Sequence, residues 1–92
     1  MAEDSIVFPD LSLIDRVREL LTALELPSAA EFRVEPALDY PGQQVAIDIA
    51  APTIATLSSA IEVIRDALFH EFRIATRTAS EFDRETLLRQ TA

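Results

Sequence analysis

The sequence predicts an α+β fold in which helices cover one face of a small antiparallel sheet. Residues 53–68 place apolar side chains at helical spacing, and residues 44–50 alternate apolar and small or polar side chains as a strand does. All five prolines and the single glycine fall before residue 53. The first part of the chain is therefore divided into short segments, whereas the second part is continuous.

The helix predicted over residues 53–68 is the segment against which the other elements are expected to pack. Pro52 ends the preceding segment, and the Thr53 hydroxyl can accept a free backbone N–H of the first turn. The apolar side is wide, so we expect it to contact both a sheet and a second helix, or a second chain. Its large residues are Ile54, Leu57, Ile61, Ile64 and Leu68.

The N-terminal third of the chain is predicted to contain a strand and a helix. Residues 6–8 indicate a short strand at a sheet edge or an extended arm, because two of them are β-branched and one is aromatic. Residues 11–25 indicate a helix that Asp10 or Ser12 would cap, and Ser12 with Asp15 resembles a capping box.

Two strands are predicted in the middle of the chain. Residues 31–40 alternate, and Pro36 inside them indicates an edge strand or a bulge because proline has no N–H to donate. Residues 40–43 indicate a turn. Residues 44–50 alternate more regularly and form the strand that the pattern supports best.

The segment 69–78 is compatible with two structures. It alternates as a strand, but Leu68 and Phe72 would also continue the apolar side of the preceding helix. We predict the strand, followed by a helix over residues 81–90 that Ser80 would cap. The predicted order is then (β)αββαβα, which is ferredoxin-like. The alternative is αββα with a long second helix, whose two-stranded sheet would need a dimer.

Composition limits what the protein can be. The 92 residues suit one domain, 1–92, and the absence of cysteine excludes disulfides and thiolate chemistry. No apolar run is long enough to cross a membrane, and the acidic start lacks a basic signal region, so we expect a cytoplasmic protein. All eight bases are arginine, which indicates a GC-rich, bacterial genome and excludes lysine-based chemistry.

The net charge of −8 is concentrated in residues 1–48, which carry ten of the sixteen acidic residues. Such a chain does not provide the positive surface that nucleic-acid binding requires. An acidic surface suits a basic protein partner, or it simply keeps a small protein in solution.

One face of the predicted sheet carries small residues flanked by charges, which would let another element approach closely. The sequence therefore predicts an interface on this face, with a homodimer as the preferred arrangement. A composition rich in alanine is the alternative explanation. The predicted interface residues are Ala37, Ala46, Asp48, Ala50, Arg73, Ala75, Arg77, Phe82 and Leu88.

Candidates for chemistry are few. Glu62, Asp66 and His70 follow one another at four-residue spacing and would share one side of a long helix, where a carboxylate and an imidazole can hold a metal. A solvated helix face with Arg65 as the local counter-charge is the preferred explanation. Glu35, Asp39 and Asp48 could cluster on the outer sheet face, but acid–base catalysis needs a cleft. We expect no catalytic residue and no cofactor.

Three functions are consistent with these observations. The first is a non-catalytic, homodimeric protein-binding module of the adaptor, chaperone or inhibitor type, with an acidic surface for a basic partner. The second is a regulatory domain of ferredoxin-like type that senses a small ligand. The third is a metal-dependent enzyme that uses Glu62, Asp66 and His70.

Overall fold

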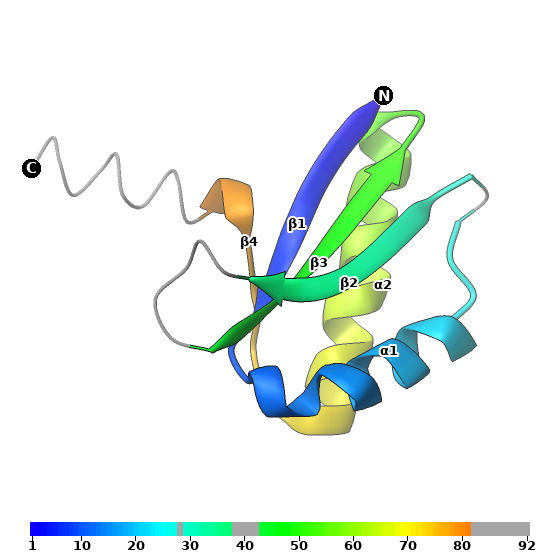
Figure 1. Cartoon of the computed structure of the whole chain (residues 1–92). Coiled ribbons are helices and arrows are strands. Elements are labelled where there is room, and N and C mark those ends of the chain that lie inside the picture. The colour runs from blue at the N-terminus through cyan, green and yellow to red at the C-terminus, as the bar shows by residue number, and fades with distance from the viewer. Residues whose placement is uncertain (28, 38–42, 82–92) are drawn as a thin grey trace, which may run out of the picture.

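The computed structural model describes residues 1–27, 29–37 and 43–81, and Figure 1 shows how the chain is arranged. The predicted α+β class with a small antiparallel sheet is confirmed. In chain order the elements are β1 (Ala2–Phe8), the 3-10 turn η1 (Leu11–Leu13), α1 (Ile14–Ala23), β2 (Glu31–Ala37), β3 (Gln44–Ala51), α2 (Ile54–Phe72) and β4 (Arg77–Thr78).

The four described strands form one antiparallel sheet in the order β2-β3-β1-β4. β2 lies at an edge, as Pro36 predicts, because a residue without an N–H is tolerated where no neighbouring strand needs that donor.

β1 is longer than the predicted strand 6–8, and the prediction that it lies at an edge is wrong. It pairs with β3 along its whole length and with β4 at Ile6 and Val7, so it lies inside the sheet. Residues 2–5 contain no β-branched or aromatic side chain, and local propensity therefore does not mark them as a strand. Pairing with β3 decides their conformation.

The core lies between one face of the sheet and the two helices. Figure 1 shows α2 running along the back of β1 and β3. Val17 and Leu21 of α1 belong to the same buried cluster as the inner side chains of the sheet, so both helices cover this face. Its fully buried members include Ile6, Phe8, Val45, Ile47, Ile49, Ile64 and Leu68.

The 3-10 turn η1 leads directly into α1, and Asp10 rather than Ser12 caps this turn. The Asp10 carboxylate accepts hydrogen bonds from the Ser12 N–H at 3.0 Å and from the Ser12 hydroxyl at 2.6 Å. The predicted capping box does not form, since Asp15 pairs with Arg18 instead, at 3.4 Å. The helix ends at Ala23, two residues earlier than predicted.

The strand predicted over residues 69–78 is wrong for most of its length. α2 continues to Phe72, and only Arg77–Thr78 joins the sheet. Leu68 is fully buried, and the Phe72 ring lies 5.3 Å from the ring of Phe8 in an edge-on arrangement. A continuous helix keeps both side chains on the core side, in line with the buried Ile64 one turn earlier.

Arg73 ends α2 in the left-handed conformation, with φ 58° and ψ 31°. Its N–H donates to the Phe69 carbonyl at 2.8 Å, which satisfies one of the last carbonyls of the helix. Glycine usually occupies this position, because a Cβ makes the conformation unfavourable.

The chain that follows α2 is held against it by Arg65. The guanidinium donates to the Thr76 carbonyl at 2.6 Å and pairs with Glu81 at 3.2 Å. Helical conformation resumes at residue 79, and the Thr78 hydroxyl accepts the Glu81 N–H at 3.2 Å. Thr78, not the predicted Ser80, therefore caps this segment.

The turn predicted at residues 40–43 and the helix predicted over 81–90 lie almost wholly outside the described residues. No helix in the part of the chain that the structure describes is long and apolar enough to cross a membrane.

Ile64→Ala tests the packing of α2 on the sheet. Ile64 is fully buried, so its truncation should lower the free energy of unfolding by about 2–5 kcal/mol. Ile54→Ala is the matched control, because Ile54 is 76% exposed on the same helix and should change stability little. Urea unfolding of both variants measures the difference, and equal effects would contradict this packing.

Arg73→Gly tests the left-handed end of α2. Removing the Cβ should stabilise the protein by up to about 1 kcal/mol, because the gain at positive φ exceeds the loss from a more flexible unfolded chain. Arg73→Ala, which removes the guanidinium but keeps the Cβ, should show no such gain in thermal unfolding. Equal stabilities of the two variants would show that the backbone conformation is not the cause.

Candidate functional site

The candidate site lies on the outer face of the sheet, opposite the face covered by α1 and α2. The strand register arranges its side chains in rows across β1, β3 and β2. In one row Ala50 lies between Glu3 and Glu31, and in the next row Asp48 lies between Ser5 and Arg33.

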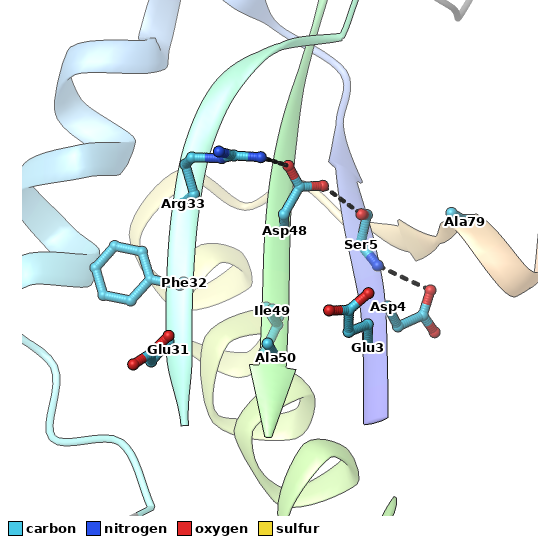
Figure 2. A pocket seen from close by; sticks show the side chains of 10 residues that line it. All are labelled: Glu3, Asp4, Ser5, Glu31, Phe32, Arg33, Asp48, Ile49, Ala50 and Ala79. Atoms are coloured by element: carbon cyan, nitrogen blue, oxygen red, sulfur yellow. Dashed lines mark hydrogen bonds and ion pairs between the residues drawn. The ribbon is translucent and has the colours of Figure 1, made fainter. Parts of the chain in front are cut away.

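These rows border an open hollow of about 730 Å³, shown in Figure 2. Strands lie about 4.8 Å apart, so Glu3 and Glu31 are separated by roughly two strand spacings, with the small side chain of Ala50 between them. The hollow contains four carboxylates and one guanidinium and is strongly acidic. Its lining residues are Glu3, Asp4, Ser5, Glu31, Phe32, Arg33, Asp48, Ile49, Ala50 and Ala79.

Asp48 is held by both a hydrogen bond and an ion pair within the site. Figure 2 shows it between Arg33 and Ser5. The Ser5 hydroxyl donates to Asp48 Oδ1 at 2.5 Å, and Arg33 Nη2 lies 3.9 Å from Asp48 Oδ2. Arg33 Nε also lies 3.7 Å from Glu35 Oε2. The guanidinium thus lies between two carboxylates but remains exposed, which makes its hold on each of them weak.

Glu35 and Asp48 interact as a pair whose pKa values move in opposite directions. A hydrogen bond to Asp48 and the negative charge of Asp48 raise the pKa of Glu35, and Arg33 opposes this only in part. Partial burial acts to raise the pKa of Asp48, but hydrogen bonds from Glu35 and Ser5 and the charge of Arg33 together lower it. A proton taken up by the pair therefore resides on Glu35.

One rim of the hollow is formed where the chain leaves β4. The Ser80 hydroxyl donates to Asp4 Oδ2 at 2.7 Å, and Asp4 Oδ1 accepts the Ser5 N–H at 2.8 Å. Together with the Arg65–Glu81 pair, this contact holds Ala79 beside β1.

The structure brings together only some of the predicted interface residues. Ala46, Asp48 and Ala50 share the outer side of β3, and Ala37 and Arg77 take the same side of β2 and β4 by register. Arg73 and Ala75 do not belong to this face, because α2 runs to Phe72 and the strand that would have carried them does not form. Phe82 and Leu88 lie outside the described residues.

The outer face is covered unevenly. Val7 is 3% exposed and Ala37 7% exposed, whereas Ala46, Asp48 and Ala50 are half-buried. The acidic hollow therefore occupies the more accessible part of the sheet.

Glu62, Asp66 and His70 lie along the exposed side of α2, in the other layer of the molecule. Within residues 1–27, 29–37 and 43–81, no three His, Asp or Glu side chains form a group that could hold a metal ion. The metal site remains a prediction from spacing. His70 is also the single histidine of the chain, so the Ser5–Asp48 pair has no imidazole beside it for nucleophilic chemistry.

Sequence reasoning missed the residues that β1 contributes to the site. Glu3, Asp4 and Ser5 precede the predicted strand, and Glu31 stands at the first position of β2. The local signal for them is weak. Glu3 and Ser5 would lie opposite Ile6 and Phe8 in an extended chain, but Asp4 falls on the apolar side and interrupts the alternation.

Comparison with known proteins gives no relative. The chain matches no protein-family model, no curated protein and no solved structure.

Glu35→Gln tests the carboxylate pair through the pH dependence of stability. The pKa of Glu35 in the folded state lies above the ordinary value of 4.5, so the folded protein binds more protons and loses stability as the pH rises through this range. Glutamine cannot ionise and can donate to Asp48. The substitution should therefore stabilise the folded protein only slightly near pH 4.5. This stabilisation should grow with pH and reach a plateau at neutral pH.

Thermal unfolding at a series of pH values measures this effect. Glu19→Gln is the control, because it removes the same charge from the exposed side of α1. A stability difference between Glu35→Gln and the unchanged protein that does not vary with pH would contradict the pairing.

Proposed function

We propose that this protein is a non-catalytic binding module whose outer sheet face receives a basic segment of a partner protein. The observation that supports this function most strongly is the row Glu3–Ala50–Glu31, in which two exposed carboxylates flank a small side chain. The gap between them suits an arginine or lysine side chain, which would contact both carboxylates.

The neighbouring row gives a second reason. Asp48 is already bonded to Ser5 and paired with Arg33, whereas Glu3 and Glu31 have no ion pair among the described residues. The available negative charge thus faces the hollow. A basic partner would be attracted over a distance and then oriented by these two side chains.

The fold that we propose for this module is ferredoxin-like. The element order βαββαβ and the strand order β2-β3-β1-β4 support it. In such an arrangement one sheet face remains available when two helices cover the other.

The sequence also predicts a homodimer through the same face, but the acidic charge of this face makes that arrangement unfavourable. A symmetric contact places the same patch of both copies together, so two acidic hollows would face each other. We therefore propose a basic protein rather than a second copy as the occupant. Sedimentation measurements over a range of concentrations test self-association independently.

The hollow also supports a second candidate function, the binding of a small cationic ligand. Its volume lies within the range of roughly 300–1,000 Å³ that small-molecule sites occupy. A polyamine that raised the melting temperature at low concentration, while an arginine-rich peptide did not bind, would favour this function.

Charge reversal tests the proposed function. Glu3→Lys combined with Glu31→Lys should weaken the binding of a labelled arginine-rich peptide at least about tenfold at constant salt. Glu62→Lys combined with Asp66→Lys is the matched control, because it changes the net charge equally on the exposed side of α2. Fluorescence anisotropy measures the peptide affinity of both double variants. An equal loss of affinity in the two would show that net charge alone causes the effect.

A further inference from the structure

The row Glu3–Ala50–Glu31 on the outer sheet face combines charge with space. Its two glutamates are exposed, whereas Ala50 between them is half-buried and carries only a methyl group. All three residues line the open hollow shown in Figure 2. A partner side chain that enters this row therefore has a carboxylate on either side and a small side chain beneath it.

The distance between the two glutamates favours a broad cation over a compact one. Glu3 and Glu31 are two strand spacings apart, or roughly 10 Å at the backbone. A guanidinium presents two forked edges, and with N–O contacts of about 2.8 Å it bridges carboxylate carbons roughly 7 Å apart. The ammonium group of lysine is a compact point charge and bridges only about 6 Å with contacts of the same length. The two glutamate side chains consequently bend less to reach a guanidinium.

The neighbouring row does not offer a second place of this kind. Asp48 accepts the Ser5 hydroxyl and pairs with Arg33, whose Nη2 lies 3.9 Å from Asp48 Oδ2. This row lies about 7 Å along the strands from Ala50 and already contains a guanidinium. The pair shows that a guanidinium and a carboxylate meet across neighbouring strands on this face, and it leaves the row of Ala50 as the place for an incoming one.

We infer that the outer sheet face binds an arginine side chain of its protein partner and selects arginine over lysine. Glu3 and Glu31 contact the two forked edges of the guanidinium. Ala50 is the specificity-determining residue, because its methyl group leaves the space in which the guanidinium lies. This inference rests on the proposed function and specifies which basic residue the partner presents.

Three labelled six-residue peptides of equal charge test the selectivity. Each alternates glycine with one basic residue, which is arginine, lysine or homoarginine, the guanidinium derivative of lysine. We expect the arginine peptide to bind at least about fivefold more tightly than the lysine peptide at constant salt. The homoarginine peptide should recover most of this difference, because it places a guanidinium on the lysine side chain. Fluorescence anisotropy measures the three affinities.

Ala50→Leu tests where the arginine lies. The larger side chain fills the space between the glutamates without changing any charge, so the preference for arginine should fall below about twofold. Ala46→Leu is the matched control and should keep the preference, because Ala46 is half-buried on the same side of β3 but lies between Val7 and Glu35. Thermal unfolding shows whether both variants remain folded.

A measurement on the unmodified protein locates the contact without a substitution. The backbone amide signals of Glu3, Ala50 and Glu31 should shift in an NMR titration with the arginine peptide. Equal affinities of the arginine and lysine peptides would overturn the selectivity while the binding of a basic segment stands. A preference that survives in Ala50→Leu, or signals of this row that do not shift, would overturn its assignment to Ala50. Failure of all three peptides to bind would overturn the proposed function as well.

Discussion

The antiparallel pairing of β1 with β3 is the constraint on which the rest of the structure depends. It joins the first strand of the chain to the third, and it fixes which side chains of both strands face inward. Ile6 lies beside Ile47 in the core, while Ser5 lies beside Asp48 on the outer face. A register shift of one residue would exchange these faces, so stability and the chemistry of the site come from the same hydrogen-bond ladder.

The core makes this register unique. α2 covers β1 and β3 with a face of aliphatic side chains, and Phe72 extends the contact to Phe8. Burying this apolar surface is the main favourable term in folding a chain of this size, and few alternative pairings would bury as much. The outer face is then free to carry charge, because its side chains are not needed to fill the core.

Neighbouring rows of that face differ in how their charge is balanced. Asp48 has Ser5 and Arg33 beside it, so most of its interactions are made within the sheet. Glu3 and Glu31 are separated by an alanine, and neither has an arginine opposite it in the strand register. An electrostatic gradient therefore exists across about two residues of strand. The proposal for a basic partner derives from this gradient.

The sequence by itself determined the class of the fold, the edge position of β2, the outer side of β3 and most of α2. These depend on local periodicity and on proline, which act through neighbouring residues. The extent of β1 and the end of α2 were decided only by the tertiary structure. Residues 2–5 have no strand propensity of their own and become a strand because β3 supplies hydrogen bonds, whereas residues 69–72 alternate like a strand but remain helical because Leu68 and Phe72 are buried together. The acidic row could not be predicted for the same reason, since Glu3 and Glu31 become neighbours of Ala50 only when three distant segments pair.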